Sequence, residues 1–190
     1  MEIDYILDQI YTLPRSSANM LKKYVSIRNY PKGHLLIKAG SVERKLYFIK
    51  SGIVRAFSES EMGETTFWFG EEGETAISMN GYVQNKKGYE NIQLLEDCVF
   101  YELDIKDLNY LYENDIHIAN WGRKFAEKEI LKMEYRIISR ELLEAGDRYK
   151  DLLNNYPNLV RRVPLKYIAS YLGITQVSLS RIRKTIILKN

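Results

Sequence analysis

The spacing of hydrophobic residues changes twice along the chain, and each change marks a different kind of structure. In the first ~24 residues, apolar side chains recur at helical spacing until Pro14 interrupts them. From about residue 25 to residue 103, short β-branched and aromatic runs alternate with turns that contain glycine. After Asp104 the spacing becomes helical again and stays so.

The middle region predicts an antiparallel β-structure. Its hydrophobic runs cover residues 35–37, 46–49, 53–57, 65–69, 76–79, 92–95 and 99–101. Short strands at ~8–12 residue spacing with turn signals between them are typical of a sandwich or barrel. No segment in this region has the length of a crossover helix, which argues against a parallel sheet.

The region after the strands predicts one long helix. Apolar residues repeat at helical seam spacing at Ala126, Ile130, Met133 and Ile137, and Trp121 and Phe125 are expected to widen this side. A helix over residues 116–140 would be ~37 Å long, more than a small barrel needs to cover itself. We predict a dimerisation helix, and the alternative is a helix that packs only on its own barrel.

The last third of the chain predicts two short helices joined by a sharp turn. The first covers residues 165–172, and its apolar face consists of Leu165, Ile168, Ala169 and Leu172. Gly173 supplies the conformational freedom for the turn. Thr175 can cap the second helix, whose Leu179 and Ile182 face the first.

The outer face of the second helix is polar and basic. Our candidate DNA-binding residues are Thr175, Gln176, Val177, Ser178, Ser180, Arg181, Arg183 and Lys184. This is the plan of a helix-turn-helix, in which the second helix enters the major groove. The alternative is an ordinary helical hairpin, but it does not explain a polar first turn followed by three basic residues.

Charge is distributed unevenly along the chain. The net charge is +3, yet residues 1–138 carry 18 basic and 21 acidic side chains, whereas residues 139–190 carry 10 and 4. No acidic residue follows Asn155, while seven basic residues do. An acidic front and a basic tail suggest that the tail meets a polyanion.

Composition excludes several classes of site. Cys98 is the single cysteine, so no intrachain disulfide, cysteine zinc site or iron–sulfur cluster is expected, and we interpret it as a small buried hydrophobe. His34 and His117 form no ligand pair, and we expect neither metal nor cofactor. The N-terminus lacks a secretory signal and no run is long enough to span a membrane, so we expect a cytoplasmic protein.

Two stretches of the chain carry a family resemblance. The string Ile168-Ala169-Ser170-Tyr171-Leu172-Gly173-Ile174-Thr175, followed by Leu179-Ser180-Arg181-Ile182-Arg183-Lys184, resembles the helix-turn-helix of the Crp/Fnr (catabolite activator) family, in the form common among Bacteroidetes-type members. The stretch from Tyr30 to Gly40, followed by Leu46 to Arg55, resembles the opening strands of that family's cyclic-nucleotide-binding barrel. The resemblance covers nearly the whole chain in the order barrel, long helix, helix-turn-helix.

The resemblance implies base-reading positions that this chain has partly changed. The family commonly reads bases with Arg, Glu and Arg, which fall here at Gln176, Val177 and Arg181. Only Arg181 keeps its type. Arg suits guanine, Gln suits adenine and Val can touch a thymine methyl group, so the preferred DNA site should differ from the activator's.

The ligand site departs further from the family pattern. The family holds ribose and phosphate with a Gly-Glu pair and an Arg-Ser pair, which fall here at Ile77-Ser78 and near Gly88-Tyr89. No Arg lies between Arg55 and Arg123. We therefore predict that the barrel does not bind cyclic AMP or cyclic GMP.

Another small-molecule effector is expected instead. The candidate lining residues are Trp68, Phe69, Met79, Tyr82 and Tyr89, and the alternative for these side chains is plain barrel core. A haem sensor is not supported, since His34 has no partner ligand in the barrel region.

Together these features predict an α+β fold in three parts. Residues 1–115 form a double-stranded β-helix of the cyclic-nucleotide-binding jelly-roll type, residues 116–140 the dimerisation helix, and residues 141–190 an all-α helix-turn-helix domain. The predicted function is a DNA-binding transcription regulator that binds a palindromic operator as a homodimer.

Two other readings compete with this function. One is a ligand-binding or protein-interaction module that has lost specific DNA binding. The other is an enzyme of the cupin type, which fails for want of clustered metal ligands on the predicted strands.

Overall fold

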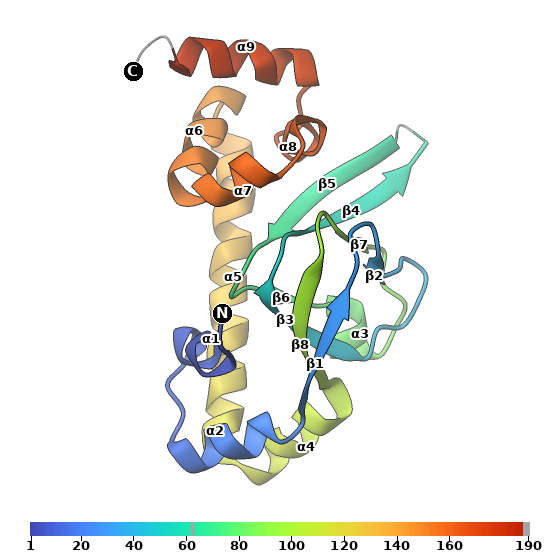
Figure 1. Cartoon of the computed structure of the whole chain (residues 1–190), viewed down its shortest axis with the longest axis vertical. Coiled ribbons are helices and arrows are strands. Elements are labelled where there is room, and N and C mark those ends of the chain that lie inside the picture. The colour runs from blue at the N-terminus through green and yellow to red at the C-terminus, as the bar shows by residue number, and fades with distance from the viewer. Residues whose placement is uncertain (62, 188–190) are drawn as a thin grey trace.

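The computed structural model describes residues 1–61 and 63–187, which form a β-barrel, a long helix beside it and a helical domain at one end (Figure 1). The N-terminal helices are α1 (Ile3–Ile10) and α2 (Arg15–Lys22). After the barrel come α4 (Ile105–Asn114) and the long helix α5 (Ile116–Leu142). The helical domain consists of α6 (Ala145–Asn155), α7 (Pro157–Arg162), α8 (Leu165–Tyr171) and α9 (Gln176–Ile187).

The barrel is made of two antiparallel four-stranded sheets. The first has the order β1-β8-β3-β6, with the strands β1 (Val25–Tyr30), β8 (Cys98–Asp104), β3 (Lys45–Ser51) and β6 (Thr75–Ala76). The second has the order β2-β7-β4-β5, with the strands β2 (Leu35–Ile37), β7 (Asn91–Leu94), β4 (Val54–Ser60) and β5 (Gly63–Gly70). The predicted α+β fold with an N-terminal jelly roll is confirmed.

The prediction of a strand over residues 76–79 is wrong after Ala76, where strand β6 ends, and the chain instead begins helix α3 (Met79–Gln84). The Ser78 hydroxyl caps this helix by accepting a hydrogen bond from the Gly81 amide. Gly81 lies so close to the backbone of Glu43 that a Cβ would not fit. A helix cap and a contact with a distant loop therefore override the β-like sequence.

Cys98 lies in the barrel core, as predicted for a small buried hydrophobe. Burial raises the pKa of its thiol to about 12, so the side chain is a neutral packing group.

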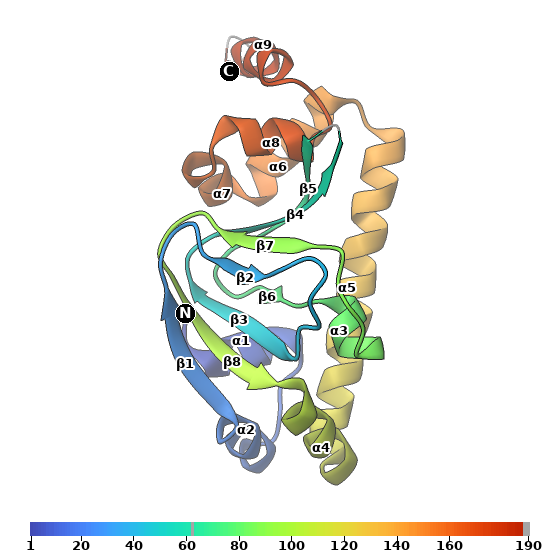
Figure 2. The same ribbon diagram turned by 90° about the vertical axis from the view of Figure 1, so that its right-hand side faces the viewer.

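Helix α5 begins at Ile116, as predicted, and runs alongside the barrel toward the helical domain (Figure 2). Trp121 and Phe125 are buried on the side of α5 that faces the chain's own barrel and N-terminal helices. The Trp121 indole packs edge-on against Phe48 and donates a hydrogen bond to the Leu7 carbonyl oxygen at 3.1 Å. The prediction that these two side chains widen the seam is therefore wrong, because the seam lies on another face.

The helical domain shares a hydrophobic core with one end of the barrel. Ile53 and Phe69 from the barrel pack in the same cluster as Tyr149, Leu159 and Ile168. This contact places the helix-turn-helix directly against the β4–β5 hairpin (Figure 1). Among the helices of the described residues, none has the length and apolar character of a membrane span.

Candidate nucleic-acid interface and its attachment to the barrel

The turn between α8 and α9 has the backbone geometry that the sequence predicted. Gly173 has a φ of +67°, a conformation that side chains with a Cβ rarely adopt. The Ile174 amide then donates to the Ala169 carbonyl oxygen at 3.0 Å, which closes the end of α8. The Thr175 hydroxyl accepts a hydrogen bond from the Ser178 amide at 3.1 Å, so Thr175 caps α9 as expected.

Helix α9 presents one side to the rest of the domain and the other to solvent. Leu179 is fully buried against α8. Ser178 and Arg183 lie half-buried at the flanks of the helix. The remaining candidates are exposed, namely Thr175, Gln176, Val177, Ser180, Arg181 and Lys184. Seven of the eight residues that the sequence selected therefore lie on α9, and the eighth, Thr175, lies directly before it as its cap.

The position and charge of α9 fit contact with a polyanion. The helix lies at one extremity of the molecule (Figure 1). Its three basic side chains are accompanied by no acidic residue anywhere after Asn155 in the sequence. A positive, exposed helix about 12 residues long has the dimensions and sign of potential that a DNA major groove accepts.

Ser170 joins the helix-turn-helix to the barrel through the edge of a sheet. Strand β5 is an edge strand, and its Thr66 amide donates to Ser170 Oγ at 2.9 Å. The same hydroxyl donates to the Glu64 carbonyl oxygen at 3.2 Å. One side chain of α8 thereby satisfies two backbone groups of β5, an arrangement that no sequence signal revealed.

Arg55 makes a second connection from the beginning of β4. Its side chain is almost fully buried, with the guanidinium between the rings of Phe57 and Tyr167 at 4.0 and 3.7 Å. It donates to Gln93 Oε1 and forms an ion pair with Glu64. Tyr167 belongs to α8, so this buried cation links barrel and helix-turn-helix. The sequence signal that could have indicated this role is the position of Arg55 within an otherwise apolar predicted strand.

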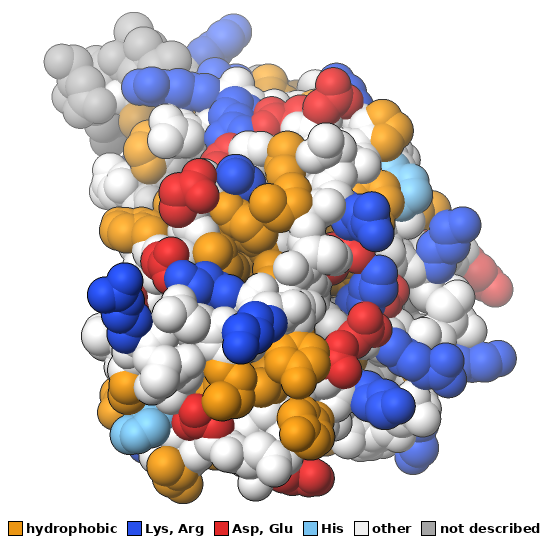
Figure 3. Space-filling model, turned by 60° about the horizontal axis from the view of Figure 1, so that its bottom comes forward, with side chains coloured by type: hydrophobic (Ala, Val, Ile, Leu, Met, Phe, Trp, Pro, Cys, Tyr) orange, Lys and Arg blue, Asp and Glu red, His pale blue; other side chains and the backbone are white. Residues whose placement is uncertain are grey.

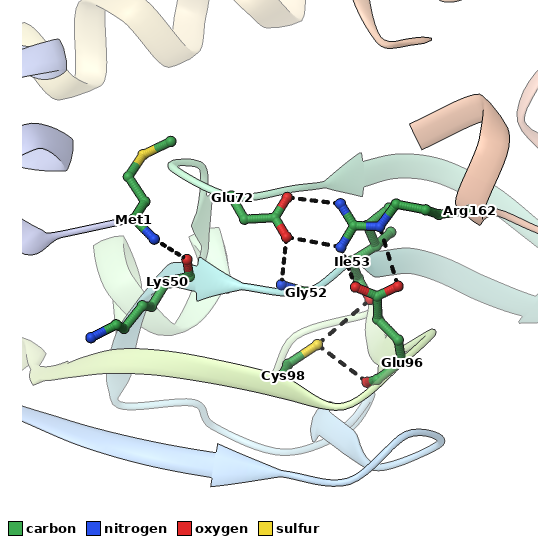
Figure 4. A network of polar contacts seen from close by, with 8 residues as sticks. All are labelled: Met1, Lys50, Gly52, Ile53, Glu72, Glu96, Cys98 and Arg162. Atoms are coloured by element: carbon green, nitrogen blue, oxygen red, sulfur yellow. Dashed lines mark hydrogen bonds and ion pairs between the residues drawn. The ribbon is translucent and has the colours of Figure 1, made fainter. Parts of the chain in front are cut away.

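Arg162 forms the third connection, which we call the Arg162 ion-pair cluster (Figure 4). This last residue of α7 donates two hydrogen bonds to the Glu72 carboxylate, at 2.8 and 2.9 Å, and pairs with Glu96. Both acids belong to barrel loops. Burial raises the pKa of Glu72, but hydrogen bonds from Arg162 and from the Gly52 amide outweigh it and lower the pKa to about 2.

The predicted seam of α5 lies exposed on the surface, and we call it the α5 apolar row. It consists of Ala126, Ile130, Met133 and Ile137. Ile130 and Ile137 are 64% and 55% exposed. A run of large apolar side chains at helical spacing that the chain itself leaves uncovered is typical of a helix–helix interface.

The end of the molecule opposite α9 has no comparable row of apolar side chains among the described residues. The end that carries α2 and α4 shows small separate hydrophobic patches among charged side chains (Figure 3). Met20 on α2, Tyr110 on α4 and Ile116 at the start of α5 are exposed there. Scattered apolar side chains of this kind are normal for a protein surface and indicate no partner.

The structure does not bring the five candidate effector residues together. Trp68 packs against the barrel core, Phe69 lies in the core shared with the helical domain, and Tyr82 packs against the core beneath α5. Met79 and Tyr89 are 48% and 65% exposed.

The positions that correspond to the family's ligand-holding pairs carry unusual chemistry. Ser78 is buried and caps α3, as described above. Glu90, beside Gly88 and Tyr89, is 5% exposed, and its Oε1 has no hydrogen-bond partner among the described residues. Its Oε2 accepts the Tyr89 amide at 3.0 Å. A buried carboxylate at this place would oppose a phosphate group.

Known proteins are similar to the chain in sequence or in fold. Residues 27–115 match the model of the cyclic nucleotide-binding domain family. No curated protein matches the sequence. FixK2 from Bradyrhizobium japonicum is 16% identical with a TM-score of 0.73, over 87% of this chain and 85% of that one.

Two further solved structures have the same fold. The catabolite activator protein of Thermus thermophilus is 21% identical with a TM-score of 0.58, over 97% of this chain and 87% of that one. A protein from Eubacterium rectale, described as a Crp/Fnr-family transcriptional regulator, is 13% identical with a TM-score of 0.71, over 93% and 85%.

The fold and the exposed helix define a two-domain protein in which a β-barrel precedes a helix-turn-helix. Its barrel region is similar in sequence to the cyclic nucleotide-binding domain family. The chain as a whole has the fold of the Crp/Fnr-type regulators.

Proposed function

We propose that the protein is a DNA-binding transcription regulator that acts as a homodimer on a palindromic operator. The observation that carries this proposal is the outer face of α9. Its exposed side chains are mostly polar or basic, and the turn before it has helix-turn-helix geometry. The regulators with the same fold support it. Since a bacterial chromosome lies in the cytoplasm, we expect the protein to act there.

Dimerisation would use the helix over residues 116–140, through its α5 apolar row. Pairing two copies along this row would bury side chains that a single chain leaves exposed. A two-fold axis along α5 would set two copies of α9 about one DNA turn (~34 Å) apart, which is the spacing a palindromic site requires.

The residues of α9 divide into base-reading and backbone-contacting groups in this proposal. Arg181 would bind guanine through two hydrogen bonds, Gln176 would bind adenine, and Val177 would contact a thymine methyl group. Ser178 and Ser180 would contact phosphates or bases, and Arg183 and Lys184 would contact phosphates. Thr175, at the cap of α9, would lie beside them.

The barrel is proposed to respond to an effector other than cyclic AMP or cyclic GMP. Arg55 alternates with the core residues Val54 and Ala56, so its side chain lies outside the barrel and is not available to a phosphate within it. Glu90 is buried beside Gly88 and Tyr89, the positions that the family resemblance aligns with its Arg-Ser pair, and a carboxylate there would oppose a phosphate. Trp68, Phe69, Met79, Tyr82 and Tyr89 stay our candidate effector residues.

An effector could act through the connections at Arg55, Arg162 and Ser170. These contacts tie the helix-turn-helix to the barrel, so a change in the barrel would alter the position of α9 as a shift between two arrangements.

Selection of bound DNA from a random pool by purified protein tests the proposed function. We expect a palindromic sequence that is bound tightly and loses affinity as salt rises. No enriched sequence, with or without added metabolite extract, would favour the alternative of a ligand-binding or interaction module without specific DNA binding.

Calorimetric titration with cyclic AMP and with cyclic GMP tests the effector prediction. We expect no saturable heat for either nucleotide. Stoichiometric binding of one of them would show that the buried Glu90 carboxylate does not exclude a phosphate.

A further inference from the structure

A hollow of about 540 Å³ lies behind the recognition helix, between α6, α7 and α9. This volume is within the usual range of small-molecule sites. Tyr149 and Leu153 from α6 and Val160 from α7 form an apolar wall. Arg161, Arg162 and Arg183 also line the hollow. It therefore combines an apolar surface with a concentration of positive charge.

The three arginines differ in how their charge is compensated. Arg162 is neutralised by Glu72 and Glu96 in the ion-pair cluster. Neither Arg161 nor Arg183 has an ion pair with any residue in 1–61 or 63–187. No acidic side chain lines the hollow. Two uncompensated guanidinium groups at one hollow repel each other unless an anion joins them.

We propose that this hollow binds a small amphipathic anion, with a carboxylate between Arg161 and Arg183 and an apolar body against Tyr149, Leu153 and Val160. A planar guanidinium matches a carboxylate through two parallel hydrogen bonds, and the wall removes apolar surface from water.

Arg183 is the one candidate DNA contact that lines the hollow, and the rest of the hollow lies away from the face of α9 that would meet DNA. Helices α6 and α7 lie on the side of α9 that faces the rest of the molecule (Figure 1). Val177, Ser180 and Arg181, at the centre of the exposed face of α9, do not line the hollow. A ligand there would contact α7 and α9 together, and so bear on the position of α9.

Calorimetric titration of the full chain with sodium octanoate tests this site. We expect saturable binding of one octanoate per chain, and Arg161→Gln should weaken it by about tenfold or more, since a hydrogen bond to a charged group contributes that much. Arg183→Gln should have a similar effect. Acetate, which lacks the apolar body, should bind at least about tenfold more weakly than octanoate.

Arg181→Gln is the matched control, because it makes the same charge change on α9 outside the hollow, and it should bind octanoate like the unaltered chain. Circular dichroism and unfolding of each variant establish that it is folded. The proposal is overturned if octanoate does not bind, if Arg161→Gln and Arg183→Gln bind it unchanged, or if acetate or inorganic phosphate binds equally tightly. Selection of bound DNA in the absence of octanoate tests DNA binding independently. Failure of the anion site can therefore be distinguished from failure of the proposed function.

Discussion

Arg181 is the residue from which direct base recognition is expected. Its side chain is exposed on α9 and has no ion pair among the described residues, so it needs to break no contact to reach a base. Arg181→Ala should lower affinity for the selected DNA site by ~1–3 kcal/mol and relax base preference at one position. Fluorescence anisotropy with labelled DNA measures this loss.

Arg15→Ala controls for the loss of one positive charge. Arg15 is exposed on α2, at the opposite end of the molecule from α9, and this variant should bind DNA as the unaltered chain does. Equal affinities for Arg181→Ala and Arg15→Ala would remove Arg181 from base reading.

The Arg162 ion-pair cluster should make stability depend on pH in a defined direction. The pKa of Glu72 is about 2 in the folded chain, against an ordinary value of 4.5. A folded-state pKa below the unfolded value contributes stability above about pH 4.5 and loses it as pH falls toward 2. Arg162→Gln should therefore destabilise the chain by about 1–2 kcal/mol near pH 7, since bidentate pairs exceed ordinary surface ion pairs.

Urea unfolding of the unaltered chain and Arg162→Gln at several pH values measures this dependence. The difference in unfolding free energy should shrink as pH falls below about 4.5 and Glu72 is protonated. A difference that is constant from pH 7 to pH 3 would mean that Arg162 stabilises the joint by packing and not through its carboxylate partners.

At the scale of elements, the α8–α9 turn depends on a backbone conformation more than on contacts. A Cβ at Gly173 would meet no atom within 4 Å, so the cost of Gly173→Ala comes from its φ of +67° alone. We expect a loss of ~1–2 kcal/mol in unfolding free energy. Gly146→Ala in α6 is the matched control, because Gly146 also has open space but no positive φ.

Urea unfolding separates the two glycine variants. Gly146→Ala should leave the free energy of unfolding unchanged or raise it slightly, since alanine has a higher helix propensity than glycine. If both variants unfolded like the unaltered chain, the turn would be able to relax to another conformation at no cost.

The α5 apolar row predicts a self-association that one charge would disrupt. Ile137→Glu replaces an apolar side chain of the row that is 55% exposed in the single chain. A dimer contains this substitution twice, once in each subunit. We expect dimer affinity to fall about 100-fold or more, because each lost isoleucine burial is worth ~1.5–3 kcal/mol. Light scattering across a concentration series measures the change.

Ile27→Glu is the control for this variant. Ile27 is also 55% exposed, but it lies on β1, away from α5. It should leave the dimer intact. A monomeric unaltered chain at micromolar concentration would contradict the pairing itself.

At the scale of the whole molecule, charge is distributed unevenly between the two parts of the chain. Residues 1–138 are net acidic and residues 139–190 are net basic. A dimer that neutralises ~6 phosphates should show a slope of about −5 when the logarithm of the binding constant is plotted against that of salt concentration. Filter binding from 50 to 300 mM salt measures the slope, and a slope near zero would exclude phosphate contacts.

The sequence alone was sufficient for the features that depend on neighbouring residues. The strand-and-turn pattern before Leu103, the helical spacing after Asp104, the positive φ at Gly173 and the cap at Thr175 are all properties of short segments. The outward face of α9 follows likewise from helical periodicity once Leu179 is placed inward.

Only the tertiary structure decided which surfaces are covered and which charges meet. Periodicity could not show that Trp121 faces the chain's own barrel while Ile130 is left exposed, because both lie on an apolar helix and the choice depends on what packs beside it. The pairing of Arg162 with Glu72 joins residues 90 positions apart. Helix α3 over residues 79–84 packs through Gly81 against the backbone of Glu43, which is also distant in the sequence. Such contacts arise from the geometry of the assembled barrel, which no local pattern encodes.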